Sequence, residues 1–412
     1  MNVDELVSDA FREQAGDSMP APPYFAERVL AVRRRRRNRR TASVAVATVA
    51  AIAVAVAVPR LVGGGDDVRP ASEMNKSSII AHPDQTPPRD LIAAGGTALA
   101  AYYVRHMVVK SATDAVNGRT YSLLDQKTGK YVKTTQWSYV SVAPGMRTAA
   151  VLEKRLPARR IGLLDLLTGK VERWIPVDHG VASAEFSSDG RKLVATTYAK
   201  DPDLVHKLDY DSDGDGKKND WGVPFGTSAR TGFCIVDVGS GKSTWSEVTD
   251  SQDLNARQDF AFSNDAQLVY SGLTTAPGTR FYDLHGNKAA TPANEKHLNW
   301  FVEARLSPDG KLGAGDFAGG RKTTASEIID PRSGKRIAKV HGQQLLAWAD
   351  NKRLIAWDIA SGTNEFHNRL VLVTIGSDTV VPLSGFRKGN DGAGGRWDPV
   401  FAKRWAAGPR GA

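Results

Sequence analysis

One short element recurs along most of the chain and constrains the fold more than any other feature. Apolar residues precede an aspartate, which is followed by a glycine-containing turn and a lysine. The copies are LLDQKTGK at Asp125, LLDLLTGK at Asp165, IVDVGSGK at Asp237, FYDLHGNK at Asp283 and IIDPRSGK at Asp330. Their aspartates are 40, 72, 46 and 47 residues apart. Because glycine adopts the positive φ that tight hairpin turns need, each copy predicts a β-hairpin.

A second hairpin element lies upstream of these copies. It reads AEFSSDGRKLVATT at Asp189, FAFSNDAQLVYSG at Asp265 and ARLSPDGKLGAGD at Asp309, with looser copies at Gly145 and Asn351. Two hairpins give four strands per repeat, and an all-strand repeat in the forties predicts a β-propeller blade. We therefore expect an all-β fold over residues 90–412 with six blades, seven being the alternative. The last strand-like piece, RWDPVFAKRWAA, is expected to complete the first blade and close the ring.

The second element carries a family resemblance. RLSPDGKLGAG and EFSSDGRKLVATT resemble the repeats of TolB-like and WD40-like β-propellers, over about residues 90–405. The dipeptide Trp-Asp that ends true WD40 blades appears only in AWDI and RWDP, which favours the TolB-like kind. The resemblance implies the architecture and does not imply an activity.

The N-terminal part predicts a membrane anchor. Thr41–Val58 contains no charged residue and, as a helix, would reach about 27 Å, close to the thickness of a bilayer core. Seven arginines precede it: Arg33, Arg34, Arg35, Arg36, Arg37, Arg39 and Arg40. The positive-inside rule then places residues 1–40 in the cytoplasm and everything after Pro59 outside, as a single-pass protein of the cell membrane. Nucleic-acid binding by the arginines is disfavoured, because they abut the apolar segment without aromatic residues between them. A cleaved signal peptide is the alternative to an anchor.

Two further segments flank the predicted anchor. Residues 59–89 read as a flexible linker, partly stiffened by proline. In the cytoplasmic tail, an apolar stripe with helical spacing is too small to form a core alone. The stripe comprises Leu6, Val7, Ala10 and Phe11. The tail is therefore either disordered or a short helix that binds a partner.

An acidic loop lies inside the longest interval between repeats. The surplus falls at about residues 199–230, and DYDSDGDGKKNDWG there contains five aspartates although the formal net charge of the chain is +10. Alternating carboxylates on a glycine-bent loop suit Ca²⁺, which takes six to eight oxygen ligands. The loop is predicted to be an insertion in the third blade that leaves the repeat undisturbed.

The loop resembles thrombospondin type-3 and EF-hand-like calcium repeats. In a twelve-position loop, ligands at positions one, three, five, seven and nine would be Asp211, Asp213, Asp215, the Lys217 carbonyl and Asn219. Gly222 replaces the usual acidic twelfth ligand, so Asp220 or Asp209 would have to supply a carboxylate. A second register starting at Asp209 puts Asp220 twelfth. These observations predict a weak calcium site, with a solvated acidic loop as the alternative.

The sequence does not indicate an enzyme. The only cysteine, Cys234, alternates like a buried strand residue, and the eight histidines lack the spacing of a zinc site. A GxSxG nucleophile turn and a phosphate-binding glycine loop are also missing from the sequence. We expect a membrane-anchored, extracytoplasmic module that binds a protein, peptide or small ligand. The alternative is an anti-sigma type of regulator whose tail binds a sigma factor, in a high-GC, actinobacterial-type bacterium. An extracytoplasmic hydrolase has the least support.

Overall fold

The computed structural model describes residues 78–211, 216–223, 228–249, 257–273, 275–320, 323–360, 366–387 and 396–405. Every regular element in these ranges is a β-strand, which confirms the predicted all-β class. None of the described residues forms a helix long and apolar enough to cross a membrane. The predicted span Thr41–Val58, the arginine run and the stripe of the tail lie outside the described residues.

The first sheet is built on a long hairpin. Its two strands are β3 (Thr97–Val109) and β4 (Asp114–Asp125). The C-terminal strand β27 (Trp397–Lys403) pairs with the other edge of β3, which confirms the predicted pairing of the last strand with the first unit. The remaining strands are β1 (Ile79–Ile80), β2 (Ala93–Ala94), β5 (Lys130–Thr134), β12 (Leu204–Lys207) and β13 (Trp221–Gly222).

The other sheets follow in chain order, each an antiparallel meander. The second sheet begins with β6 (Trp137–Val142), β7 (Thr148–Glu153), β8 (Ala158–Asp165) and β9 (Lys170–Val181). Through the pair Val181↔Thr197 it continues into β10 (Glu185–Phe186), β11 (Lys192–Tyr198), β14 (Arg230–Asp237) and β15 (Ser243–Glu247). The third contains β16 (Ala261–Phe262), β17 (Leu268–Gly272), β18 (Thr279–Asp283) and β19 (Lys288–Ala289). The fourth contains β20 (Gly313–Phe317), β21 (Ala325–Ile329) and β22 (Arg336–His341). The fifth contains β23 (Gln344–Trp348), β24 (Arg353–Ile359), β25 (Asn368–Thr374) and β26 (Val380–Pro382).

The repeated aspartates form the predicted hairpin turns. Asp165 Oδ1 accepts hydrogen bonds from the backbone N–H groups of Leu167 and Thr168, at 2.6 and 3.1 Å. Gly169 then takes a φ of +69°, a conformation that costs little without a Cβ. Asp125, Asp237, Asp283 and Asp330 also accept backbone N–H groups from the turn that follows them. The sequence therefore predicted these turns from their residue types.

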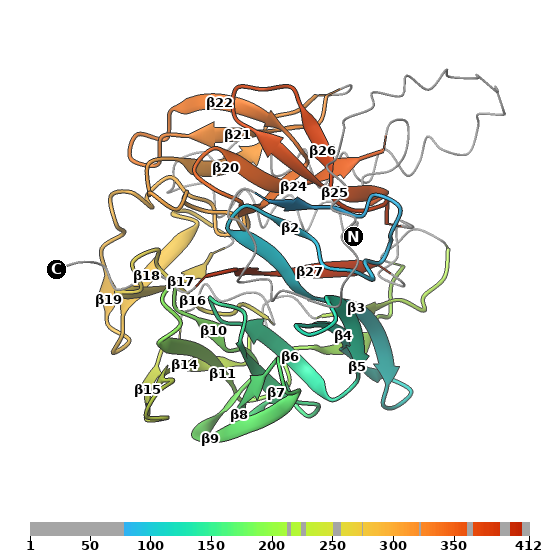
Figure 1. Cartoon of the computed structure of the whole chain (residues 1–412). Coiled ribbons are helices and arrows are strands. Elements are labelled where there is room, and N and C mark those ends of the chain that lie inside the picture. Colours follow the sequence, from blue (N-terminus) through green and yellow to red (C-terminus); the bar gives the residue numbers. More distant parts are fainter. Residues whose placement is uncertain are drawn as a thin grey trace, which may run out of the picture. The chain divides into compact units, whose positions relative to one another are not determined.

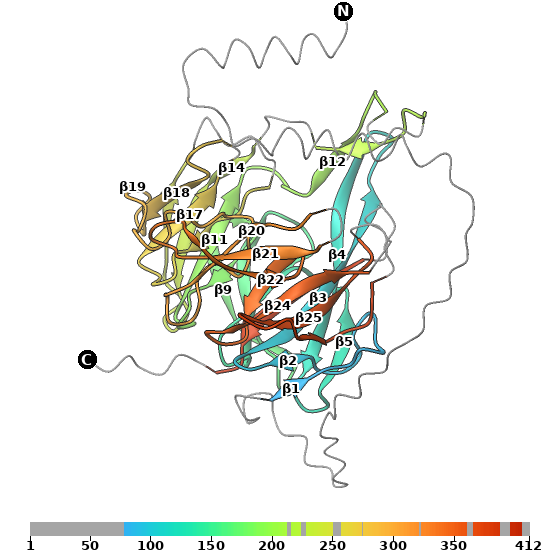
Figure 2. The ribbon, with the colours of Figure 1, turned by 90° about the horizontal axis from the view of Figure 1, so that it is seen from above.

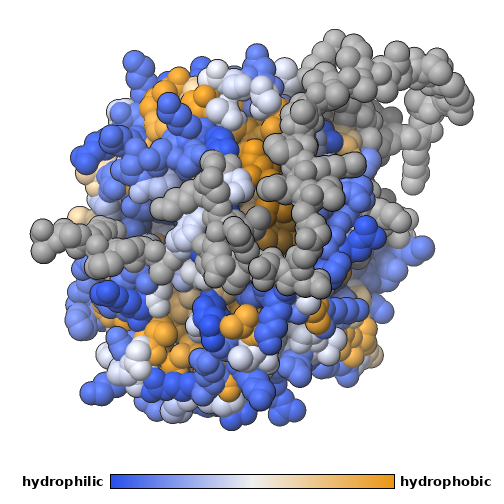
Figure 3. All heavy atoms as spheres, viewed as in Figure 1, coloured by the Kyte–Doolittle hydropathy of each residue, from blue (hydrophilic) through white to orange (hydrophobic). Residues whose placement is uncertain are grey.

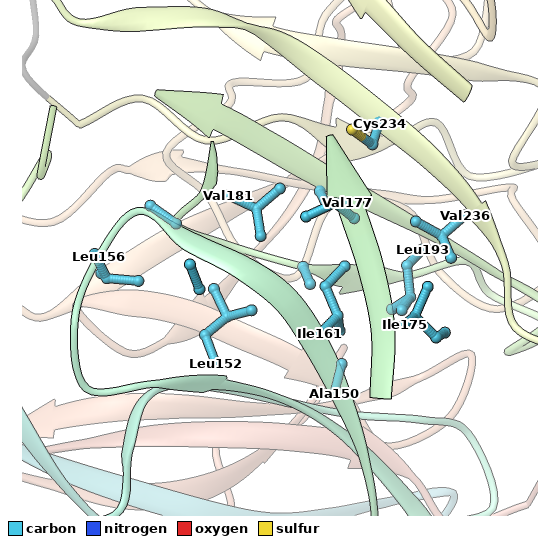
Figure 4. Packing of buried hydrophobic residues seen from close by; sticks show 14 of the residues in the cluster. Ala150, Leu152, Leu156, Ile161, Ile175, Val177, Val181, Leu193, Cys234 and Val236 are labelled. Atoms are coloured by element: carbon cyan, nitrogen blue, oxygen red, sulfur yellow. The ribbon is translucent and has the colours of Figure 1, made fainter. Parts of the chain in front are cut away.

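Apolar residues fill the space between the two halves of the second sheet and between the last sheet and the first. One cluster joins β7–β9 to β11 and β14, with Leu152, Ile161 and Val181 facing Leu193 and Cys234 (Figure 4). Cys234 is buried and free, as expected. Another cluster joins the last sheet to the first, because residues of β24 and β25 pack against β2, β3 and β27. The last sheet therefore packs against the first.

We call the strand nearest the centre of the circle in each unit its inner strand. The inner strands are β27, β6, β10, β16 and β23, and the segment around Leu306 takes the corresponding place beside β20. Their C-terminal ends meet: Gly145 N donates to Lys403 O at 2.9 Å, and Lys403 Nζ donates to Trp348 O at 3.4 Å. In Figure 1 the colours of the sequence succeed one another around the view, and red β27 lies beside β3, its partner from the blue end of the sequence. A closed circle of antiparallel sheets around their first strands is a β-propeller.

The outer surface is mostly polar. On the face seen in Figure 3, hydrophilic residues predominate and hydrophobic ones form separate groups between them. The exposed large apolar side chains of the described residues include two on β3 and two beside the hairpin of β12 and β13. These are Met107, Val109, Tyr210 and Val223.

Candidate binding site

Part of the first sheet projects beyond the beginnings of the inner strands. Arg119, in the middle of β4, is level with the start of β6, since its Nη1 donates to Ser138 O at 3.3 Å. Residues of β4 before Arg119, and the residues of β3 paired with them, therefore extend past that level. Figure 2 shows this extension of β3 and β4, with β12 beside its end.

The inserted segment extends the first sheet instead of forming a loop on the third repeat. β5 pairs with Tyr121–Asp125 of β4, and β12 pairs with the free remainder of the same edge, from Asp114 to Val116. The insertion follows β11 in the chain and leaves the pairing of β11 with β14 intact, but its hairpin pairs with β4 of the first sheet. The physical reason is that the projecting end of β4 offers unpaired backbone groups, which a short antiparallel hairpin satisfies.

The acidic loop closes this inserted hairpin. Leu208 N donates to Asp220 O at 2.8 Å, so the loop begins directly beyond that pair. Asp209, Asp211, Lys217 and Asn219 are exposed. The predicted ligands Asp213 and Asp215 lie outside the described residues. Among the residues that are described, no three acidic, histidine or cysteine side chains are gathered as metal ligands.

Two details of the loop fit the expected calcium register. Gly216, at its sixth position, has a φ of +87°, which provides the sharp turn. Its N–H donates to Asp211 Oδ2 at 2.9 Å, so the first and sixth positions are in contact. Gly222 at the twelfth position is a strand residue opposite His206 and brings no carboxylate. The fit therefore covers the beginning of the loop and not its end.

The base of the inserted hairpin is anchored by a buried carboxylate. Asp203 immediately precedes β12, and Arg119 donates to both of its oxygens, at 2.7 and 2.9 Å. Arg257 Nη1 donates to Asp203 Oδ2, also at 2.7 Å. Burial alone would raise the pKa of Asp203, but the two guanidinium groups lower it below its ordinary value.

The anchor extends into a network that joins four repeats. Arg257 Nη2 donates to Ala182 O at 2.7 Å, and Arg257 Nε donates to Asp259 Oδ2 at 2.9 Å. The Tyr198 hydroxyl donates to Asp259 Oδ1 at 2.9 Å. Arg119 lies on β4. Ala182 precedes β10, and Tyr198 is the last residue of β11. Arg257 and Asp259 lie just before β16. Beside them, Tyr139 of β6 donates to Glu185 Oε1 at 2.5 Å.

Glu185 differs electrostatically from Asp203. Burial raises its pKa, and the nearby Asp259 raises it further, although the hydrogen bond from Tyr139 acts in the opposite direction. Among the described residues, Asp203 forms ion pairs with two arginines, whereas Glu185 forms none. At the beginnings of the inner strands, the charges of Asp203 and Asp259 are therefore compensated by arginine, and that of Glu185 is not.

The projecting sheet also has an apolar face. Val109 lies opposite Ala115, which lies opposite Val205, and Val205 precedes the pair His206↔Gly222. Directly paired residues point to the same side of a sheet, so Met107, Val109 and Val223 share a face. Their exposed fractions are 47%, 59% and 40%.

Two histidine–aspartate pairs were missed in the sequence. His206 Nδ1 lies 2.7 Å from Asp114 Oδ1, and His341 Nε2 lies 2.6 Å from Asp358 Oδ1. The first pair joins β12 to β4, and in the second Arg369 also donates to Asp358 at 3.1 Å. Strand pairing brings the first pair together, and the second pair joins β22 to β24 of the next sheet, so no local sequence pattern predicted either pair.

Comparisons with known proteins leave the family open. Neither a protein-family model nor a curated protein matches the chain. Among solved structures, TolB from Acinetobacter baumannii is 14% identical, with a TM-score of 0.37, over 75% of this chain and 67% of TolB. The Cps50 (Swd1) β-propeller domain of Myceliophteria thermophila is 13% identical, with a TM-score of 0.30, over 67% of this chain and all (100%) of that domain. Kuenenia stuttgartiensis hydrazine synthase is 14% identical, with a TM-score of 0.34, over 63% of this chain and 71% of that one. TM-scores and identities this low carry no argument about the fold. The closed circle of sheets in this chain itself identifies the architecture as a β-propeller.

Proposed function

We propose that this chain is a binding module that recognises a protein outside the membrane, through the projecting sheet and the adjoining beginnings of the inner strands. The observation that carries the proposal is the construction of the inserted hairpin. Its backbone extends β4, and its base is clamped by Asp203 between two arginines. A recognition element on a rigid scaffold is typical of binding surfaces.

The exposed side chains of the projecting sheet support a protein partner. Met107, Val109 and Val223 form an apolar face, and Tyr210 stands 56% exposed at the beginning of the acidic loop. Apolar groups next to polar rims are typical of protein interfaces, where tyrosine and methionine are enriched. Catalysis is not part of the proposal.

The propeller is proposed to have six blades of the TolB-like kind. The four-stranded units would be β27-β3-β4-β5, β6 to β9, β10-β11-β14-β15, β16 to β19 and β23 to β26. The remaining blade would be β20 to β22 with the segment of Leu306, which forms a bridge to Gly313. Each unit thus places its inner strand first, and β27 closes the circle.

The acidic loop is proposed to bind Ca²⁺ weakly and thereby stiffen the inserted hairpin. The contact between Asp211 and Gly216 supports the register, and the crowding of aspartates supplies the driving force. Asp211, Asp213, Asp215, Asn219 and the Lys217 carbonyl would hold the ion, with Asp220 or Asp209 as a further ligand. The ion would supply no chemistry beyond coordination.

Anchoring by Thr41–Val58 and an extracytoplasmic propeller are part of the same proposal, supported by the apolar run and the arginines before it. The protein should then stay in membranes through carbonate washing, with its propeller open to external protease. Recovery of a shorter soluble chain beginning near Pro59 would identify a cleaved signal instead.

The anti-sigma type of regulator is the second candidate, supported by the apolar stripe of the tail. Replacing Leu6 and Phe11 with serine should abolish capture of a purified cytoplasmic sigma factor by the full chain. Equal capture by the variant and the unaltered chain, or none by either, would remove this candidate.

Site-specific photocrosslinking in the native host tests the binding surface. A photoreactive phenylalanine analogue at Val109 or Tyr210 should crosslink to one protein of defined mass. The matched control is Ile337 on β22, which is 54% exposed against 59% for Val109. Labelling that is equal at Ile337 and Val109 would contradict a dedicated surface.

A further inference from the structure

We propose that Glu185, together with Asp259, binds a cationic side chain, lysine or arginine, of the protein recognised by the projecting sheet. The inference rests on the proposed function and names the chemistry of the partner. Both carboxylates belong to the beginnings of inner strands, Glu185 as the first residue of β10 and Asp259 just before β16.

The carboxylates lie next to the base of the inserted hairpin. Arg257 connects Asp259 to this base, since it donates from Nη1 to Asp203 and from Nε to Asp259, at 2.7 and 2.9 Å. A protein seated on the projecting sheet would therefore extend side chains over this region. The side chain of Asp259 is 25% exposed, and Glu185 and Tyr139 are half-buried, so solvent reaches them.

The two arginines of the network already have hydrogen-bond partners within the protein. Arg119 donates both terminal nitrogens to Asp203, and Arg257 divides its three nitrogens among Asp203, Asp259 and Ala182 O. Within the described residues no lysine or arginine forms an ion pair with Glu185. Its Oε1 accepts the Tyr139 hydroxyl, which brings a proton donor and no charge. A half-buried carboxylate beside a second carboxylate favours a positive group from outside.

A second observation points to the same place. Ser183 is fully buried, and its hydroxyl has no hydrogen-bond partner among the described residues. Ala182, Ala184 and Phe186 face the apolar cluster behind β10. Alternation along the extended segment then directs Ser183 to the same side as Glu185. A buried hydroxyl without a partner carries a free-energy cost that a hydrogen-bonding ligand relieves.

The aromatic surroundings suit an ammonium or guanidinium group. The Arg257 guanidinium already lies 5.7 Å from the centre of the Tyr139 ring. Charge-assisted hydrogen bonds to a carboxylate are stronger than neutral ones, so a cation gains from Glu185 what a neutral amide cannot.

Small cations provide a direct test with the full chain in lipid nanodiscs. The probes are n-butylammonium, n-butylguanidinium and the neutral N-butylacetamide, and the reporter is the carboxyl ¹³C signal of labelled glutamate. The Glu185 signal, identified by its loss in Glu185→Gln, should shift saturably with both cations and not with the neutral probe. Ser183→Ala should weaken this binding about threefold and leave the fold intact. A linear, non-saturating shift equal to that of the exposed Glu247 would overturn the inference.

Crosslinking at Val109 separates this inference from the proposed function. Glu185→Gln should weaken the partner's apparent affinity at least about tenfold, since it removes a charge-assisted bond, while the matched control Glu247→Gln should leave it unchanged. Unaltered crosslinking in Glu185→Gln, with no saturable cation binding to the unaltered chain, would overturn the cation site and leave the binding module standing. Saturable cation binding without any crosslink at Val109 would support the carboxylate site and remove the proposed protein surface.

Discussion

The inserted hairpin has an acidic tip and an acidic base, and the two ends differ in every physical respect. At the tip, Asp209 and Asp211 are exposed and close to other aspartates in the chain. At the base, Asp203 is 6% exposed and shared by two arginines. The base is a structural joint, because its charge is neutralised inside the protein. The tip is exposed to solvent, and we propose that its carboxylates bind Ca²⁺.

The comparison predicts its largest effect at the base. Asp203→Ala would leave Arg119 and Arg257 buried without their common partner, which typically costs about 3–5 kcal/mol of unfolding free energy. Asp211→Ala in calcium-free buffer should change the unfolding free energy by less than about 0.5 kcal/mol. Denaturant unfolding of both variants measures the difference. Similar stabilities would show that the joint does not hold the hairpin.

Calcium should produce an intermediate effect, confined to the tip. A ligand at ten times its dissociation constant adds about 1.4 kcal/mol to the unfolding free energy, so millimolar Ca²⁺ should raise the melting temperature. Mg²⁺ should do much less, because it demands compact octahedral geometry. Asp213→Ala should abolish the response, while Asp378→Ala, an exposed aspartate in another hairpin, should preserve it. If calorimetry detects no binding at several millimolar Ca²⁺, the tip is a solvated acidic loop.

The smallest effect concerns Glu303, a third kind of carboxylate. Glu303 is exposed, yet desolvation by the surrounding protein atoms raises its pKa to about 7, and the nearby Asp398 adds to the shift. The folded chain then holds a proton that the unfolded chain releases, so stability falls as pH rises towards 7. Glu303→Gln should flatten this decline by less than about 1 kcal/mol, because solvent screens the group. Denaturant midpoints at pH 5 and pH 8 measure it, and an unchanged slope would contradict the raised pKa.

Asp203 should show the opposite pH dependence. Its folded pKa lies below the ordinary value, so the stability it contributes is present above the unfolded pKa and is lost as pH falls through the folded one. Asp203→Asn should therefore lose its disadvantage relative to the unaltered chain in strong acid. A constant difference between pH 7 and pH 3 would argue against an ionised Asp203.

The same contrast explains what the sequence predicted. Turn residues such as Asp165 and Gly169 act on their own neighbours, so the hairpins and their repetition were readable from residue types. The tip was found for the same reason, since its aspartates are close together in the chain. The joint at Asp203 could not be predicted from the sequence, because Arg119 and Arg257 lie 84 and 54 residues away from Asp203 in the chain. Glu185 and Tyr139 likewise meet across 46 residues, and only the closed circle of sheets brings them together.

The pairing of β27 with β3 has a consequence for how the chain is made. Residues Thr97 to Val104 leave the ribosome long before their partners Lys403 to Trp397, which lie about 300 residues further along the chain. Until Trp397 to Lys403 have been synthesised, one edge of β3 therefore stays open to foreign strands, and any product truncated before Trp397 keeps it open. The pairing of β27 thus acts as a latch that closes an edge at which chains could otherwise associate.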